Sequence, residues 1–408
     1  MELNPRLIRW IDKNLGIILC FVFTLYRRVL LLFKRNQGDF RNPHKILFIK
    51  LVEQGSIVLA YSALKKAEKK VGRENIYFMV FKKNRPILDI LQIIPSSNII
   101  EIDSSGILRF FFSVISGLYR IRREKVDTVI DMEFFSRATA ILAYLSGADK
   151  RVGLHRFNCE GLYRGDLFTH RLIYNPYLHT KVLFLSLVEA LNYEPPLDEI
   201  PMIFKVPKVT VEPPTFFPTE EEKKSIIEKI EQLKGSSLTK PVIVLNPKIG
   251  DLLPARRWSK NNYIKLAMMI LEDFPHATII ITGDTKDKKE DALLASQMRN
   301  AISLAGHISL RELLTLYFIA EVLVTSDSGP AHFSTLTPIK SVILFGPETP
   351  FLYGPERNEK RVVIAQDLVC SPCVSVYNQR RALCRRGECV KNIKVEEIYK
   401  IVKDFLQE

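Results

Sequence analysis

The sequence of 408 residues lacks the features that mark several classes of protein. Its six cysteines are not spread along the chain, because four of them lie between residues 370 and 389. This clustering is unlike the scattered cysteines of a secreted disulfide scaffold. No internal repeat of solenoid period is present. These absences leave an ordinary globular protein, and 47% apolar and 25% charged residues agree with that class.

Acidic residues are outnumbered by basic ones. The chain has 45 Asp and Glu against 59 Lys and Arg, which gives a formal charge of +14. This excess favours an anionic partner such as a nucleic acid, a membrane surface or a phosphorylated substrate. A basic, well-solvated surface is the alternative. Because no nucleic-acid recognition motif is present, we expect no nucleic-acid partner.

Long apolar runs are scarce, and the main one lies near the N-terminus. It reads LGIILCFVFTLY at 15–26, which is shorter than the ~20 residues of a membrane-spanning helix. No small-residue cleavage site follows it, so we expect no signal peptide. Arg27 and Arg28 interrupt the apolar stretch, and Lys34 and Arg35 close it. We interpret residues 1–42 as a membrane-interface segment; a helix docked on the protein's own core and a spanning anchor are the alternatives.

The rest of the chain alternates between apolar runs and helical patterns. The runs KILFIKL, NIYFMVF, SNIIEID and DTVIDME predict buried parallel strands within a first domain at 43–205. Seven of the 22 prolines lie between residues 195 and 218, and they predict a linker, which with a connecting helix occupies 206–240. The runs PVIVLNP, ATIIITGD, EVLVTSD and SVILFG predict a second domain at 241–408. We therefore expect an α/β fold of two Rossmann-like domains with parallel sheets and ligands bound in the cleft between them.

Polar residues collect where the strands of the second half are expected to end. Asn246, Asp284 and Asp327 each follow an apolar run, and Gly346 follows the last one. Each residue alone is weak support, since α/β loops are often rich in Gly and Asp. Four such positions in one half of the chain point to one site.

The stretch VTSDSGPAH at 324–332 is the most specific of these strand ends. Pro330 suits the first position of a helix, and the free N–H groups there favour an anion such as a pyrophosphate. Gly329 lets a ligand approach the backbone. His332 can donate to a phosphate or a sugar hydroxyl, and Asp327 can accept from hydroxyls. A capped turn with a structural His is the alternative.

Several stretches resemble glycosyltransferase family 9, the bacterial heptosyltransferases and their relatives. In the second half these are SDSGPAH, FGPETPFLYGP and LNPKIGDLLPARRWSKNNYIKLA. In the first half ILFIKLVEQGSIVLAYSAL and DMEFFSRATAILAYLSGADKRVGL are less specific. The resemblance runs from about residue 45 to the C-terminus. It implies a GT-B fold and inverting, metal-independent transfer from a nucleotide sugar, typically ADP-heptose. The residues expected to bind the donor are Asn246, Arg256, Asp284, Asp327, Ser328, Gly329, Pro330, His332 and Gly346.

One departure from the family concerns the catalytic base. The family's first loop reads Gly-Asp, and that Asp is the proposed general base, whereas this chain reads Gly55-Ser56. An inverting transfer needs a base near the acceptor hydroxyl. The candidates are Glu53 in the same loop and Asp131 or Glu133 at the end of the fourth strand. Alternatively, the acceptor needs little help, or the protein binds its ligands without catalysis.

The clustered cysteines suggest a structural site. Two residues separate the first pair, ten the next and four the last, a pattern that suits a tetrahedral zinc site. Two disulfides or four reduced thiols are the alternatives. The resemblance implies that catalysis itself needs no metal or other cofactor. The four candidate ligands are Cys370, Cys373, Cys384 and Cys389.

Taken together, these patterns predict a glycosyltransferase that is peripheral on the cytoplasmic face of the bacterial inner membrane. It would move a heptose or related sugar onto a lipopolysaccharide-type or other lipid-linked glycan. The stretch 107–125 is apolar and aromatic and then basic, which suits either a core helix or a surface toward an anionic lipid-linked acceptor. A non-catalytic relative that binds nucleotide sugars is the alternative function.

Overall fold

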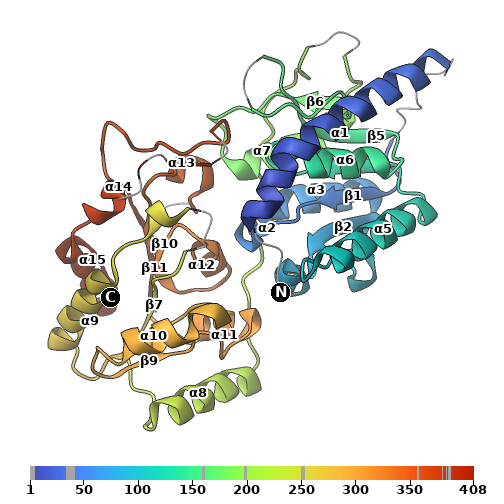
Figure 1. Cartoon of the computed structure of the whole chain (residues 1–408). Coiled ribbons are helices and arrows are strands. Elements are labelled where there is room, and N and C mark those ends of the chain that lie inside the picture. The colour runs from blue at the N-terminus through green and yellow to red at the C-terminus, as the bar shows by residue number, and fades with distance from the viewer. Residues whose placement is uncertain are drawn as a thin grey trace. The chain divides into compact units, whose positions relative to one another are not determined.

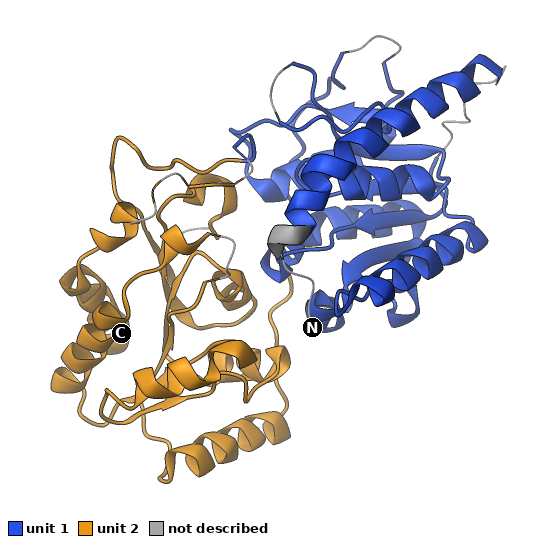
Figure 2. Ribbon diagram, viewed as in Figure 1, with its two compact units in different colours: residues 1–212, 376–379 blue, residues 213–375, 380–408 orange. Residues whose placement is uncertain are grey.

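The computed structural model describes residues 5–33, 42–158, 161–196, 200–249, 253–355, 358–378, 380–382, 384 and 387–408. Two compact units divide the chain (Figure 2). Unit 1 comprises residues 1–212 and 376–379, and unit 2 comprises residues 213–375 and 380–408. The division after residue 212 falls within the proline-rich stretch.

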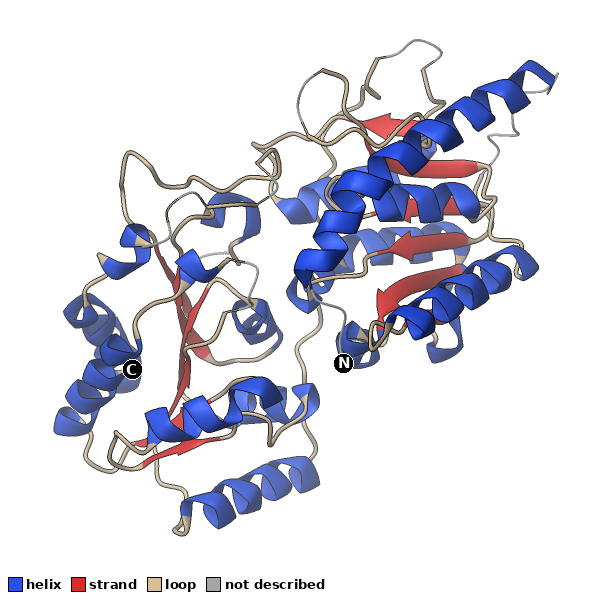
Figure 3. Cartoon of the chain, viewed as in Figure 1, coloured by secondary structure: helices blue, strands red, loops and turns tan. Residues whose placement is uncertain are grey.

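Unit 1 is built on a parallel sheet of six strands, in the order β3-β2-β1-β4-β5-β6 (Figure 3). Nearly every strand residue is buried, because helices cover both faces, and this explains why the strands read as continuous apolar runs. The strands are β1 Ile46–Ile49, β2 Ile76–Phe81, β3 Ile99–Ile102, β4 Thr128–Asp131, β5 Lys150–Leu154 and β6 His170–Leu172.

The helices of unit 1 include a long N-terminal helix that packs on α6 (Figure 1). This helix, α1, spans 29 residues and continues through Arg27 and Arg28. Its part Ile8–Phe33 is long and apolar enough to cross a membrane by length and composition alone, whereas the apolar run counted in the sequence had only twelve residues. The helices are α1 Pro5–Phe33, α2 Gln54–Leu59, α3 Tyr61–Val71, α4 Pro86–Leu91, α5 Ile107–Arg123, α6 Arg137–Leu145 and α7 Thr180–Glu189.

A short piece from late in the chain belongs to unit 1. Within residues 376–379, Tyr377 lies edge-on to the ring of Tyr174, with 5.4 Å between the ring centroids. The Tyr377 hydroxyl donates to the backbone carbonyl of Tyr174 at 3.1 Å. Unit 1 therefore contains residues that are 203 positions apart in the sequence.

Unit 2 is a second parallel six-stranded sheet, in the order β12-β11-β10-β7-β8-β9. Its strands are β7 Val242–Asn246, β8 Thr278–Ile281, β9 Ala301–Ser303, β10 Val322–Ser326, β11 Lys340–Leu344 and β12 Arg361–Ile364. Its helices are α8 Glu220–Lys234, α9 Lys260–Asp273, α10 Lys288–Ala295, α11 Leu310–Ile319, α12 Gly329–Phe333, α13 Pro350–Tyr353, α14 Glu388–Lys391 and α15 Val395–Gln407.

An aromatic pair in the core of unit 2 fixes the end of β7. Trp258 is fully buried, donates to the carbonyl of Ile393 and meets the ring of Tyr263 edge-on. The Tyr263 hydroxyl donates to the backbone carbonyl of Asn246 at 3.2 Å. Helix α9, which carries Tyr263, is thereby tied to the carboxyl end of β7, where the predicted site begins.

Candidate donor site and catalytic loop

The central strands of unit 2 bring the predicted residues to one edge of the sheet. Strand β10 lies between β7 and β11, and its register pairs Thr325 with Asn246 and Ser326 with Leu344. The backbone N–H of Asp327 donates to the carbonyl of Leu344 at 2.9 Å, which holds the loop after β10 against β11. Asn246 and Asp327 therefore lie at neighbouring strand ends. Asp284 follows the end of β8 on the other side of β7 and is exposed.

Two buried carboxylates and two partly buried guanidinium groups form a charged network at this edge. One nitrogen of the Arg256 guanidinium lies 3.4 Å from the Asp327 carboxylate and 3.2 Å from the Glu348 carboxylate. Arg380 donates to both oxygens of Glu348, at 2.6 and 3.0 Å. Asp327 and Glu348 are 4% and 1% exposed, so both carboxylates depend on the two guanidinium groups for compensation.

The environment of Asp327 changes its acidity. Burial raises the pKa of Asp327 to about 7; the Arg256 guanidinium opposes this rise, and the Glu348 carboxylate adds to it. A carboxyl in this environment titrates near neutral pH, whereas an exposed one is ionised there. Strong perturbation by burial and specific charges is typical of functional sites.

Two buried polar atoms beside the network have no hydrogen-bond partner among the described residues. The Asn246 amide nitrogen donates to the carbonyl and hydroxyl oxygens of Thr282, which leaves its Oδ1 as the unsatisfied acceptor. The Nε of Arg256 is an unsatisfied donor. A buried polar atom without a partner costs about 1–3 kcal/mol. A ligand or water that met both atoms would recover this free energy.

The helix that follows Asp327 is short. Helix α12 begins at Gly329 with Pro330 in its first turn, as expected, but it has only five residues and a 3₁₀ turn follows it. Ser328 stands before the helix in extended conformation, and its hydroxyl donates to the carbonyl of Ser326. His332 is 9% exposed. The dipole of so short a helix is small, so side chains carry most of the charge of the site.

Gly346 has a packing role that the sequence did not reveal. A Cβ at this position would lie 2.2 Å from Cγ2 of Val390 and 3.1 Å from Sγ of Cys389. The glycine therefore lets α14 approach the end of β11. Its carbonyl accepts from the hydroxyl of Ser371.

The cysteine cluster does not form a metal site within the described part of the chain. No group of three or more His, Cys, Asp or Glu residues there is arranged to hold a metal ion. Cys389 instead packs in the core of unit 2. Burial and nearby thiols raise the pKa of Cys373 and Cys389, which favours thiols over the thiolates that bind zinc. Neither zinc nor a disulfide is supported for Cys370, Cys373, Cys384 and Cys389.

In unit 1 the first loop contains the partly exposed candidate base, Glu53. Glu53 precedes α2 with a positive φ of 68°, a conformation that is costly for a residue with a side chain. Its carboxylate is 3.9 Å from Nζ of Lys50, and its side chain is 30% exposed. The hydroxyl of Ser56 donates to the backbone carbonyl of Glu53 at 2.7 Å. This serine therefore holds the loop that presents Glu53.

The other two carboxylates are buried and fully engaged. Asp131 is paired with Arg164 and also accepts from the Thr139 hydroxyl and the backbone N–H of Glu133. Glu133 accepts from Lys50 at 3.0 Å and from two backbone N–H groups of the first loop. Both are 7% exposed or less, so neither carboxylate is open to an acceptor hydroxyl. Their geometry is that of a support for the loop.

Glu348 and Arg380 complete the network, although neither was among the residues expected to bind the donor. Glu348 follows β11 in FGPETPFLYGP, so its strand-end position was an available signal. Arg380 lies among the cysteines, far from any predicted strand end. Its partnership with Glu348 depends on a non-local contact.

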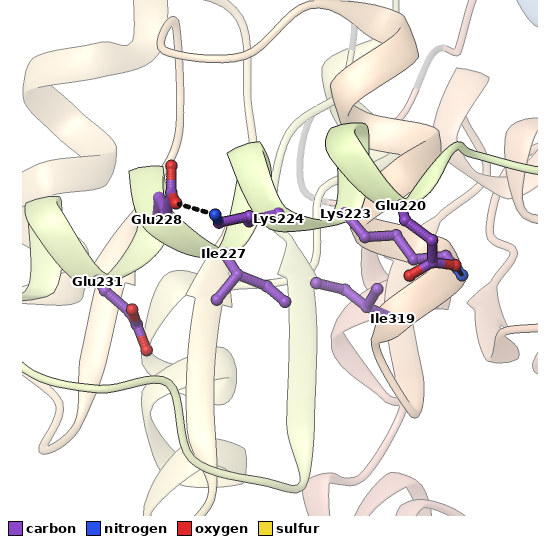
Figure 4. Close-up of a pocket in the computed structure, with 7 residues that line it drawn as sticks. All are labelled: Glu220, Lys223, Lys224, Ile227, Glu228, Glu231 and Ile319. Atoms are coloured by element: carbon purple, nitrogen blue, oxygen red, sulfur yellow. Dashed lines mark hydrogen bonds and ion pairs between the residues drawn. The ribbon is translucent and has the colours of Figure 1, made fainter.

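A surface hollow of about 430 Å³ lies elsewhere on unit 2, along α8 (Figure 4). Its lining is mostly Lys and Glu side chains of one exposed helix face, with Ile227 and Ile319 at its floor. Lys224 and Glu228, one turn apart on α8, pair with each other at 3.8 Å (Figure 4). None of the strand-end residues lines it. We regard it as a solvated helix surface.

Comparison with solved structures defines the class of fold. An Escherichia coli ADP-heptose lipopolysaccharide heptosyltransferase II matches with a TM-score of 0.65 at 17% identity, covering 89% of this chain and 98% of that one. A family 9 glycosyltransferase from Veillonella parvula matches with a TM-score of 0.66 at 20% identity, covering 91% and 99%. An E. coli heptosyltransferase with ADP-2-deoxy-2-fluoro heptose matches with a TM-score of 0.57 at 12% identity, covering 88% and 99%. These likenesses confirm the predicted GT-B fold.

Sequence comparison then gives the family. Residues 118–382 match glycosyltransferase family 9 (heptosyltransferase). This chain belongs to that family. It is 26% identical over 173 residues to lipooligosaccharide heptosyltransferase 2 of Campylobacter jejuni. This match covers 41% of this chain and 52% of the relative, so the chain spans only about half of the relative's length. It is 21% identical over 375 residues to lipopolysaccharide heptosyltransferase 1 of Campylobacter coli, covering 88% of this chain and 98% of the relative.

Proposed function

We propose that this protein is an inverting, metal-independent glycosyltransferase that moves a heptose from ADP-heptose to a lipopolysaccharide-type, lipid-linked glycan. The observation that carries the proposal is the charged network of Asp327, Arg256, Glu348 and Arg380 at the strand ends of unit 2. Membership of family 9 and the names of its relatives support the choice of sugar and acceptor.

The network suits a sugar diphosphate. Arg256 lies between two carboxylates, and its unsatisfied Nε is available for a phosphate oxygen. A guanidinium recognises phosphate through two parallel hydrogen bonds, which a lysine cannot reproduce. The free Oδ1 of Asn246 and the carboxylate of Asp327 supply acceptors for hydroxyl groups of the donor. We place the donor at these residues, with Ser328, Gly329 and His332 in the adjoining loop.

We assign the general base to Glu53. In the transfer, the bond between C1 of the sugar and the diphosphate oxygen breaks, and a new bond forms between C1 and the acceptor oxygen. The acceptor hydroxyl must lose its proton as this bond forms. The carboxylate of Glu53, which is partly exposed in the first loop of unit 1, would accept that proton. The strained backbone of Glu53, held by Ser56 and by the Glu133 contacts, fixes where the carboxylate is presented.

The acceptor and the charge of the chain agree with a place at the cytoplasmic face of the inner membrane. A lipid-linked acceptor is held in a bilayer, and a formal charge of +14 favours a surface of anionic lipid. We therefore propose peripheral association of the protein with that face.

The test is turnover of ADP-heptose by purified protein with acceptor glycolipid extracted from membranes of the source bacterium. GDP- and UDP-sugars serve as donor controls, and Glu74→Gln, an exposed acid of unit 1, is the matched control for Glu53→Gln. We expect Asp327→Ala to lose donor binding and Glu53→Gln to lose turnover while it still binds the donor. Turnover that survives both changes would refute the assigned residues.

The second candidate, a non-catalytic relative, is favoured by one observation. Ser56 stands where the family has its acid, and its hydroxyl is engaged with the Glu53 carbonyl. Saturable ADP-heptose binding without turnover, in the presence of the native acceptor, would select this alternative.

A further inference from the structure

Helix α1 is attached to unit 1 along one side of its length. Asp12 accepts from the backbone N–H of Ala138 at 2.8 Å, in the first turn of α6. The Thr24 hydroxyl accepts from the backbone N–H of Asp166 at 2.8 Å. The attached positions recur every three or four residues and therefore share one face of the helix. They are Asp12, Gly16, Cys20, Thr24 and Arg27.

The opposite face of α1 is apolar and open to solvent. Only 17% of its most apolar window is buried. The side chains at the centre of this face are 42–83% exposed and follow one another at intervals of three, four or seven residues. They are Ile11, Ile18, Val22, Leu25, Val29 and Leu32. A soluble monomer rarely exposes an apolar strip of this length, so the strip is expected to have a partner.

Helix α5 presents a second strip on the same side of the sheet. Phe110, Val114 and Leu118 of α5 pack against the cluster that also contains Cys20 and Phe23 of α1. The outward residues Leu108, Phe112, Ile115 and Tyr119 are 61–73% exposed. Helices α3 and α7, which lie outside this cluster and pack on each other, expose no large apolar side chain. Among these four helices of unit 1, the exposed apolar strips therefore lie on α1 and α5.

The charges around the strips identify the partner. Helix α1 has five basic residues and one acid; Asp12 is used in the contact with α6, and Arg27 is used in the ion pair with Asp166. Helix α5 has four arginines and no acid. A groove of about 450 Å³ at the edge of α1 brings the exposed Arg156 beside the apolar Ile17, Ile18 and Phe21. Arg137 also lines this groove, but it is buried and donates to the backbone carbonyls of Tyr163 and Asp12. Apolar strips bordered by cations match an anionic lipid surface.

We propose that α1 lies flat in the interface of an anionic bilayer, with α5 beside it, and that the groove beside Arg156 receives a lipid phosphate. A helix that spans a membrane is surrounded by lipid or by other membrane helices. The polar attachments at Asp12, Thr24 and Arg27 hold α1 on a unit that has a water-exposed surface. Spanning would break these attachments, whereas lying in the plane keeps them and buries the apolar face. The inference goes beyond the proposed transfer reaction and does not depend on the donor site.

The first experiment is flotation of the full chain with vesicles of phosphatidylcholine alone or mixed with phosphatidylglycerol. We expect binding to the anionic vesicles, and a loss of about fivefold in Arg156→Gln, the effect of one cation at a lipid surface. The double change Val22→Glu and Leu25→Glu should remove most of the binding. The matched controls are Arg299→Gln, and the double change Met268→Glu with Leu293→Glu at exposed apolar positions of unit 2.

The second experiment measures depth. The chain has two tryptophans, and Trp258 is fully buried, so it gives a constant background. A tryptophan placed at Val22 in a Trp10→Phe chain should be quenched by lipids brominated near the headgroup. Stronger quenching by lipids brominated near the chain ends would show a spanning helix and overturn the proposal.

Two other results would also overturn it. The first is a failure of the flotation experiment: either the control variants lose as much vesicle binding as the α1 and Arg156 variants, or the unchanged protein does not bind vesicles. The other is a dimer in solution that Val22→Glu with Leu25→Glu converts to a monomer without any vesicle binding, which would make a second copy the partner. ADP binding by calorimetry, measured on the same variants, reports unit 2 separately and keeps failure of the donor site distinct from failure of this inference.

Discussion

Asp327→Asn should stabilise unit 2 at pH 8 while it removes donor binding. The unfolded chain ionises this carboxyl near its ordinary pKa of 3.8, whereas the folded chain holds the proton up to a pKa of about 7. Between these values the folded state binds more protons, so stability falls as pH rises. Each pH unit over this range corresponds to about 1.4 kcal/mol. The loss is therefore on the order of a few kcal/mol, and it belongs to the interacting carboxyls of Asp327 and Glu348 together. Asparagine keeps the shape of the carboxyl without the charge.

The assay is urea unfolding between pH 4 and pH 8, followed by the fluorescence of Trp258 in a Trp10→Phe chain, because Trp258 lies in the core of unit 2. The difference in unfolding free energy between Asp327→Asn and the parent should grow in favour of the variant as pH rises. Asp404→Asn on the exposed face of α15 is the control and should show no such trend. A variant that is destabilised more at pH 8 than at pH 5 would refute the reasoning, because Arg256 would then stabilise the charge more than burial opposes it.

Three further changes test the site and its support. Glu53→Gln should lower kcat by about 10²- to 10⁴-fold, the usual contribution of a general base, with donor affinity unchanged. Arg256→Lys should weaken ADP binding by about tenfold or more in calorimetry, since lysine lacks the paired donors and leaves Glu348 with one guanidinium fewer. Gly346→Ala should destabilise unit 2 by about 1–3 kcal/mol in urea, because the added Cβ would meet Val390 at 2.2 Å.

Each of these three predictions would be contradicted by a different result. An unchanged pH profile and rate in Glu53→Gln would remove that residue from the proton transfer. Full ADP affinity in Arg256→Lys would place the diphosphate elsewhere. A Gly346→Ala variant as stable as the parent would mean that α14 shifts at no cost in free energy. The control is Gly235→Ala, where φ is +74° and nothing lies within 4 Å of an added Cβ. Its loss of stability would come from backbone strain and not from packing.

The parallel sheets could be predicted because strands buried on both faces leave continuous apolar runs in the sequence. The strand-end site followed from the same pattern, since neighbouring parallel strands end at one edge. Asn246 and Asp327 could therefore be placed together before any coordinates were known. Glu348 had the same signal, but a single acid in a Gly-Pro loop is ambiguous until its two arginines are seen.

Features that depend on distant contacts could not be predicted. Arg27 was expected to interrupt the apolar stretch, but its guanidinium donates to Asp166, 139 residues away, within one continuous helix. Gly346 was expected at the donor site as a strand-end residue, and its packing against Val390 depends on a contact that is distant in the sequence. The positive φ of Glu53 is likewise set by the contacts of the loop, which no local pattern encodes.

The contact between Tyr377 and Tyr174 has a consequence for synthesis of the protein. The ribosome translates all six strands of unit 1 long before it reaches residues 376–379. Unit 1 therefore emerges before Tyr377 is available to pack against the ring of Tyr174. Closing a loop of 203 residues costs little more entropy than closing one of half that length, but the search is slow compared with local folding. Unit 1 thus reaches its final packing only after most of unit 2 has been translated. Folding of unit 1 is therefore completed only late in synthesis of the whole chain.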